Sequence, residues 1–139
     1  LAMARLVWSG LMATYDLAVI THQLGGMVPF YGERIEMFDE IWRSYPEVYP
    51  QQHRPFDTGL KAQFQRFYAD IAIHGSEPSL AAGYDFFGPE RLVFGVDYPF
   101  GPDNGRKLYE VTVPAVEAMD IAQSDKDRIF SGNLTELLG

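Results

Sequence analysis

The sequence predicts an α/β fold in which short parallel strands alternate with helices. Three stretches have strand character: LAVIT (17–21), FYADIAI (67–73) and LVFGV (92–96). The first and third are nearly continuous apolar runs, which is typical of strands covered on both faces of a parallel sheet. Helical patterns separate the three stretches, and this alternation indicates parallel βαβ units.

The helical patterns are defined by the spacing of apolar residues and by end signals. Residues 32–45 carry apolar side chains at helical spacing, at Ile35, Phe38, Ile41 and Trp42. Further helices are predicted over residues 5–14, 78–87 and 108–119, and after an N-cap at Ser124. Pro114 is expected either to kink its helix or to set the start of that helix.

Residues 44–60 interrupt the alternation. The segment contains Pro46, Pro50 and Pro55 and few periodic apolar residues. It is predicted to be a long ordered loop or an insertion, and such loops are often functional. His53, within this segment, is interpreted as a solvated loop residue.

Composition excludes several classes of function. The net charge of −8 is unfavourable for binding nucleic acid or an anionic membrane surface. The absence of cysteine excludes disulfides, a cysteine-ligated zinc and a cysteine nucleophile, and it fits a cytoplasmic protein. No apolar run is long enough to span a bilayer. We therefore expect a cytoplasmic protein with a small-molecule ligand, and neither a nucleic-acid nor a membrane partner.

Side chains that bind metals or transfer protons follow all three predicted strands. His22 and Gln23 follow the first, His74 follows the second and Asp97 follows the third. The carboxyl ends of parallel barrel strands face the same end of the molecule, where active sites lie. Two imidazoles and one carboxylate at that end suit Zn, Fe or Mn.

Each of these residues also has a structural interpretation. A single histidine at a strand end is more often a hydrogen-bonded structural residue than a metal ligand. Asp97 could simply cap the following turn. However, Asp97 directly follows a stretch of buried-strand type, where an unpaired carboxylate is costly, and this favours a functional role.

Three segments resemble one protein family. The segment ITHQLGGMVPFYGERIE (20–36) resembles the strand-6 signature of the amidohydrolase-2 branch of the amidohydrolase superfamily. This branch includes aminocarboxymuconate-semialdehyde decarboxylase and the resorcylate-type decarboxylases. LVFGVDYPFG (92–101) resembles its strand-8 signature, and SGNLTELLG (131–139) resembles its closing helix.

The resemblance implies the C-terminal portion, about strands 6–8 with their helices, of a (β/α)8 barrel with a divalent metal. Zinc is the expected metal, with manganese or iron as alternatives. Asp97 matches the strand-8 metal ligand, which also handles a proton. The strand-6 histidine of the family falls at Gln23 when the segments are aligned on Pro29, with His22 one residue earlier. His74 falls where some relatives carry a strand-7 histidine, and it is expected to line the substrate pocket.

The departures from the family pattern leave alternatives open. Glutamine has no accessible pKa and cannot act as a general base, so either His22 takes the role of the family histidine or the chemistry is altered. The HxH pair of the first family strand has no counterpart here, and a barrel needs roughly 250 residues. We therefore expect residues 1–139 to be one partial domain. Its parent enzyme would be a hydrolase or decarboxylase for a small carboxylated, cyclic substrate. The alternative is a non-catalytic fragment that associates with itself or with a missing barrel half.

Overall fold

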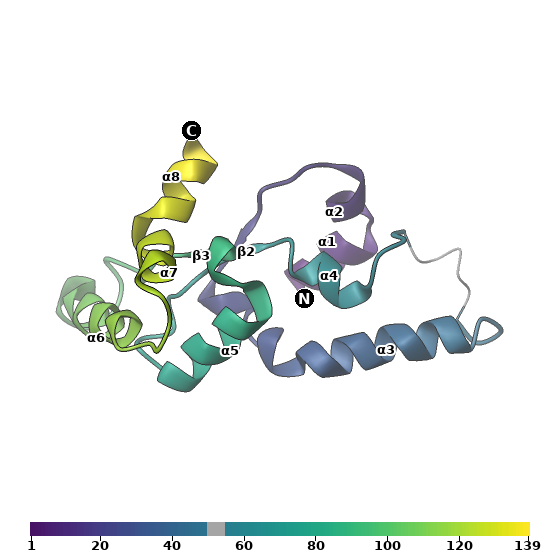
Figure 1. Cartoon of the computed structure of the whole chain (residues 1–139), viewed down its shortest axis with the longest axis horizontal. Coiled ribbons are helices and arrows are strands. Elements are labelled where there is room, and N and C mark those ends of the chain that lie inside the picture. The colour runs from purple at the N-terminus through teal and green to yellow at the C-terminus, as the bar shows by residue number, and fades with distance from the viewer. Residues whose placement is uncertain (50–54) are drawn as a thin grey trace.

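The computed structural model describes residues 1–49 and 55–139, and within these ranges it forms one parallel sheet with helices around it (Figure 1). The strands are β1 (Ile20–Thr21), β2 (Tyr68–Asp70) and β3 (Leu92–Val93). They lie in the order β1-β2-β3, with Ile20 opposite Tyr68 and Ala69 opposite Leu92. The predicted α/β class with parallel strands is confirmed. His53 lies outside the described residues.

The helices alternate with these strands along the chain. The α-helices are α1 (Ala2–Trp8), α2 (Leu11–Thr14), α3 (Gly32–Ser44), α4 (Leu60–Phe64), α5 (Glu77–Phe87), α6 (Arg106–Glu117), α7 (Gln123–Asp127) and α8 (Asn133–Leu138). Shorter turns are η1 (Gln23–Gly25), η2 (Pro29–Tyr31), η4 (Pro89–Arg91), η5 (Pro102–Gly105) and the π-helical η6 (Arg128–Gly132). No helix of the described residues is both long and apolar enough to cross a membrane.

The strands are shorter than predicted, and β1 is more exposed. Leu17 and Ile20 are 38% and 44% exposed, so the expectation that the 17–21 run is covered on both faces is wrong. The ladder reaches one residue before β1, because the Tyr68 amide donates to the Val19 carbonyl at 2.9 Å. β1 pairs only with β2 in the described chain, so its outer edge has no strand neighbour.

The helix predictions are partly confirmed. α3 and α5 match the predicted 32–45 and 78–87 closely. The predicted helix 5–14 is divided at Gly10, whose φ of 77° belongs to the left-handed region that favours glycine. A Cβ at Gly10 would lie 2.9 Å from the Cβ of Pro55, so the close approach of this loop also requires glycine.

Pro114 was expected either to kink its helix or to set the start of that helix. The second alternative is excluded, because Pro114 lies inside α6, which starts at Arg106. The predicted N-cap at Ser124 is wrong. The N-cap of α7 is Ala122, so Ser124 lies within the helix. α4 was not predicted, because its five residues are too short for helical periodicity to appear against the proline-containing segment.

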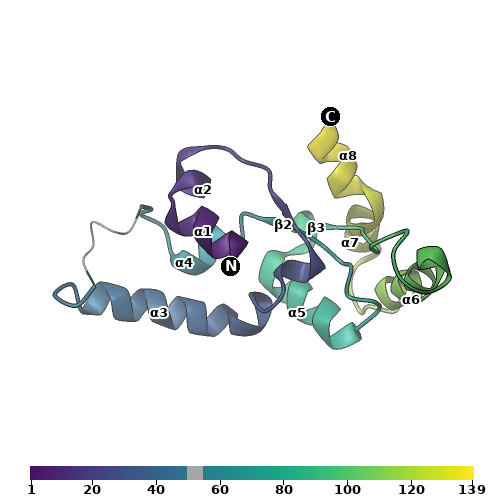
Figure 2. The ribbon, with the colours of Figure 1, turned by 180° about the vertical axis from the view of Figure 1, so that it is seen from behind.

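The core brings both ends of the sequence onto the sheet. The most deeply buried large apolar side chains are Val7, Met12, Phe67, Ile71, Leu80, Leu92, Val116 and Ile129. In both ribbon views α1, α2 and α4 lie beside the long α3, whereas α5, α6, α7 and α8 lie at the other end of the molecule (Figures 1 and 2). The rings of Trp8 and Trp42 stack at 4.9 Å and join α1 to α3.

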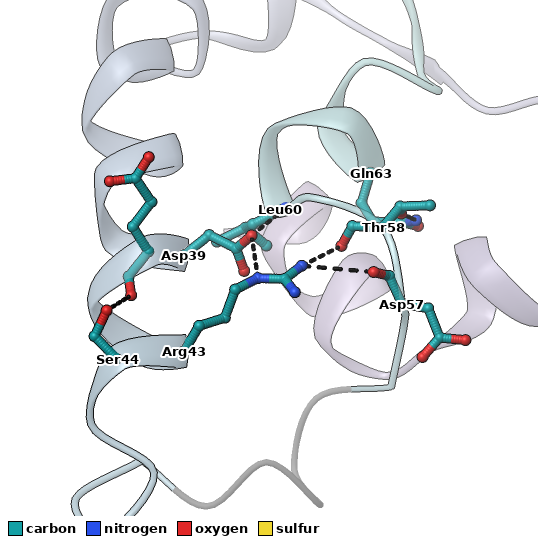
Figure 3. Close-up of polar contacts among 8 residues, drawn as sticks. Asp39, Arg43, Ser44, Asp57, Thr58, Leu60 and Gln63 are labelled. Atoms are coloured by element: carbon teal, nitrogen blue, oxygen red, sulfur yellow. Dashed lines mark hydrogen bonds and ion pairs between the residues drawn. The ribbon is translucent and has the colours of Figure 1, made fainter.

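A buried carboxylate joins α3 to the start of α4. Asp39 is 7% exposed, and its Oδ2 accepts hydrogen bonds from the Leu60 amide and from Arg43 Nε, both at 3.2 Å. Arg43 Nη2 donates to the carbonyls of Asp57 and Thr58 at 3.5 and 3.4 Å (Figure 3). Asp39 thus caps the N-terminus of α4 from a neighbouring helix, where a negative charge is favourable.

A second buried polar side chain joins the last helix to the sheet. Asn133 is 3% exposed, and its Nδ2 donates to the carbonyls of Pro89 and Leu92 at 2.6 and 2.7 Å. Arg128 Nη1 donates to the Asn133 Oδ1 at 3.3 Å. The asparagine therefore fixes the junction between η4 and β3 from 41 residues away in the sequence.

Replacing Asn133 with alanine is expected to lower the free energy of unfolding by about 1–3 kcal/mol, because the buried carbonyl of Leu92 and the partly buried carbonyl of Pro89 lose their donor. Urea denaturation of Asn133→Ala measures this loss. Thr135→Ala, at an exposed position of the same helix, is the control and should change stability little. Equal stability of the two variants would contradict the assigned role of Asn133.

Candidate active site

The loops that follow the three strands leave from the same edge of the sheet, because the strands are parallel. His22 directly follows β1. His74 and Asp97 lie further from their strands, after residues that are extended or in turns outside the ladder. Of the predicted histidines and aspartate, only His22 directly follows its strand.

His74 and Asp97 come together from two different loops. The His74 Nε2 lies 3.8 Å from the Asp97 Oδ2, within ion-pair distance when the imidazole is protonated. The side chains are 53% and 35% exposed, so the pair is open to solvent and to a ligand. Backbone bonds hold the loop of Asp97, whose carbonyl accepts from the Phe100 amide at 2.8 Å.

His22 and Gln23 lie at the neighbouring strand end, and both are exposed. They line a cavity of about 280 Å³ together with residues of α1 and Phe64. Gln23 also borders a second cavity, of about 310 Å³, which includes Ile73 and Phe30. A larger cavity of about 590 Å³ lies between α1, α3 and α4, and none of the predicted site residues lines it.

Left-handed backbone conformations occur in all three strand-end loops. Gln23, Leu24, His74 and Asp97 have φ between 51° and 60°. Such conformations cost non-glycine residues about 1–3 kcal/mol each and persist only where the surrounding structure fixes them. They cluster at active sites and ligand clamps, so their presence here supports a functional assignment of this edge.

Asp70, the last residue of β2, was not singled out by the sequence analysis. Its Oδ1 accepts hydrogen bonds from the Gln23 amide at 2.7 Å and from the Ala72 amide at 3.0 Å. A signal was present in the sequence, because a carboxylate within the largely apolar stretch FYADIAI requires partners.

The side chains of this edge make up only part of a metal site. No group of three or more histidine, aspartate or glutamate side chains that could hold a metal occurs among residues 1–49 and 55–139. Catalytic metal sites use three or more protein ligands. Asp97 and His74 therefore do not by themselves fit a complete ligand set.

The fold of the chain is similar to that of several decarboxylases. The 5-carboxyvanillate decarboxylase of Sphingomonas paucimobilis superposes with a TM-score of 0.74 at 20% identity, covering 98% of this chain and 38% of the enzyme. A dihydroxybenzoic acid decarboxylase of Polaromonas sp. JS666, with bound manganese and 2-nitroresorcinol, gives 0.75 at 23% identity, covering 97% and 38%. The apo form of IDCase from Metarhizium anisopliae gives 0.75 at 26% identity, covering 99% and 38%.

The chain thus spans less than half the length of these solved structures. No curated protein matches it significantly by sequence. The sequence profile of the amidohydrolase family (Amidohydro_2), in contrast, matches residues 16–139, which include every strand and all four predicted site residues. The chain therefore belongs to the amidohydrolase family.

Proposed function

We propose that this chain forms strands 6–8, with their helices, of a (β/α)8 barrel that is a metal-dependent decarboxylase or hydrolase. The substrate class is a small, cyclic carboxylate. The observation that carries the proposal is the meeting of His74 and Asp97 at 3.8 Å on the carboxyl edge of a parallel sheet. Family membership and the similarity to benzoate-type decarboxylases support it.

Of the two reactions, decarboxylation is favoured, because the similar solved structures include a 5-carboxyvanillate decarboxylase and a dihydroxybenzoic acid decarboxylase. In that reaction the bond between the ring carbon and the carboxylate breaks, carbon dioxide leaves and a proton is delivered to the ring carbon. In this proposal the carboxyl group of Asp97 would give up or accept that proton. His74, whose Nε2 lies 3.8 Å from the Asp97 Oδ2, would exchange protons with it.

His22 and Gln23 are the two candidates for the strand-6 position. His22 directly follows β1 and carries an imidazole, which can act as acid or base near neutral pH. Gln23 can only donate or accept hydrogen bonds, so in that position it would hold a substrate oxygen without moving a proton. Both side chains border the same cavity, which is compatible with either assignment.

A divalent metal is part of the proposal. The similar decarboxylases of Polaromonas and Novosphingobium contain manganese, which supports a divalent ion without singling out zinc. Such an ion polarises a carboxylate or lowers the pKa of water. Asp97 would contribute one ligand, and in a whole barrel the remaining ligands would come from other strands.

A second candidate function is that of a non-catalytic module that associates with itself or with another part of a barrel. The observation in its favour is the exposed apolar side chains at β1, where Ile20 is 44% exposed and Leu17, just before the strand, is 38% exposed. An open strand edge with apolar neighbours is a template for further pairing.

The 139-residue chain alone is expected not to retain a divalent metal, because its described residues include no cluster of three ligands. The test is metal content after loading with manganese or zinc and dialysis against a weak chelator. One ion per chain, lost in Asp97→Asn, would show that the chain holds a complete site.

In the complete enzyme, Asp97→Asn is expected to lower kcat by at least about a hundredfold, the scale of a proton-transfer group. Carbon dioxide release from 2,6-dihydroxybenzoate and 5-carboxyvanillate measures the change. Asp120→Asn, in the turn after α6, is the matched control. Unchanged turnover of Asp97→Asn on a substrate that the enzyme accepts would remove Asp97 from the mechanism.

The pair His22→Asn and Gln23→His decides which residue occupies the strand-6 position. If His22 acts, His22→Asn should lose activity by a factor close to that of Asp97→Asn, and Gln23→His should be neutral or harmful. If Gln23 occupies the position, Gln23→His should raise activity and His22→Asn should be silent. Parental rates in both variants would show that neither residue takes part.

The chain is expected to self-associate through the open edge of β1. Light scattering at micromolar concentration should show a dimer or larger species, and Ile20→Lys should shift it toward the monomer because edge lysines block pairing. Met37→Lys, at an exposed position of α3, is the control. A monodisperse monomer of the unaltered chain would refute association.

A further inference from the structure

Asp70 contacts all three strand ends of the candidate site. It ends the central strand, and its Oδ1 accepts from the Gln23 amide in the loop after β1 at 2.7 Å. The same oxygen accepts from the Ala72 amide at 3.0 Å, at the start of the loop that carries His74.

The contact with the third strand end is steric. A Cβ built on Gly95 would lie 3.1 Å from the Cβ and 3.5 Å from the Cγ of Asp70. The backbone two residues before Asp97 therefore packs directly against the Asp70 side chain. Any side chain at position 95 would push Asp70 by a few tenths of an ångström.

The hydrogen bond to Gln23 acts where the backbone is strained. Gln23 and Leu24 have φ of 53° and 51°, and two successive left-handed residues without glycine are unfavourable. Within the turn, the Gly25 amide donates to the His22 carbonyl and the Gly26 amide donates to the Gln23 carbonyl, while the buried Leu24 packs on Gly83 of α5. The hydrogen bond from the Gln23 amide to Asp70 ties this turn to the end of β2.

We propose that Asp70 is a positioning residue, which sets the placement of His22 and Gln23 relative to His74 and Asp97. This inference rests on the proposed function for its kinetic consequence. Asp70 itself touches no reacting atom in this scheme. It acts through the backbone amides from which its Oδ1 accepts and through its packing on Gly95.

A positioning role makes a specific demand on the side chain. The site requires an oxygen acceptor at the Oδ1 position and does not require a negative charge. The Asp70→Asn variant would retain that acceptor with nearly the same shape, whereas Asp70→Ala removes both the acceptor and the contact with Gly95. The asparagine variant should therefore rescue what the alanine variant loses.

The first measurement uses the amide of Gln23 in the 139-residue chain and needs no activity. In ¹H–¹⁵N spectra, Asp70→Ala should move the Gln23 amide proton upfield and speed its hydrogen exchange, while amides of α6 stay in place. Asp70→Asn should preserve slow exchange. If Asp70→Ala fails to fold, Gly95→Ala serves instead, because its added methyl displaces the carboxylate and should move the same resonance. An unchanged Gln23 amide in the folded variant would overturn the proposal.

The second measurement is kinetic and is made in the complete enzyme. Asp70→Ala should lower kcat by about ten- to a hundredfold, the effect of a misplacement on the order of an ångström. Asp70→Asn should retain most of the activity, and Asp120→Ala should match the parent enzyme. A loss in Asp70→Asn as large as in Asp70→Ala, with both folded, would overturn the proposal because charge would then be what matters. Parental kcat in Asp70→Ala, with a moved Gln23 amide, would also overturn it.

The two proposals fail in distinguishable ways. If Asp97→Asn and both strand-6 variants turn over substrate like the parent, the proposed function is wrong whatever Asp70 does. If Asp97→Asn is inactive but Asp70→Ala is not, the proposed function stands and the positioning role of Asp70 falls.

Discussion

The parallel ladder centred on β2 is the constraint on which the rest of the structure depends. Because β1 and β3 both pair with β2 in parallel, the three following loops leave from one edge of the sheet. Residues as far apart in the sequence as His22 and Asp97 are thereby placed at the same edge. The Asp70 carboxylate adds to this ladder at the end of β2, where its Oδ1 accepts from the Gln23 and Ala72 amides. Local strain at Gln23, His74 and Asp97 is tolerated because this framework holds the loops.

Buried polar side chains join helices to one another and to the sheet. Asn133 binds two carbonyls at the start of β3, and Asp39 caps α4 from α3. Each satisfies backbone groups that would be costly to leave unpaired in the interior. The Asp39 contact joins two helices that lie between β1 and β2 in the sequence, whereas the Asn133 contact holds the segment that follows β3.

The candidate site lacks a complete set of metal ligands among the described residues. Asp97 and His74 meet, His22 and Gln23 border a neighbouring cavity, and the described residues form no three-ligand cluster. Within the described chain, β1 has an open outer edge and exposed apolar residues. The chain belongs to the amidohydrolase family and covers 38% of the length of the similar decarboxylases, and in the proposed function it is one sector of a larger barrel. The covalent chemistry would then depend on groups from other sectors as well as on those described here.

The sequence by itself determined the parallel α/β class, the positions of α3 and α5, and the presence of His22, His74 and Asp97 after strands. These follow from local periodicity and from end signals such as Gly88, which act over a few residues. Only the tertiary structure decided the short strands, the split at Gly10, the helix α4 and the contact between His74 and Asp97. It also revealed Asp70 as the group that joins the strand ends. Those features depend on close approaches between distant segments, such as Gly10 with Pro55 and Asp70 with Gly95, and no local pattern encodes such distances.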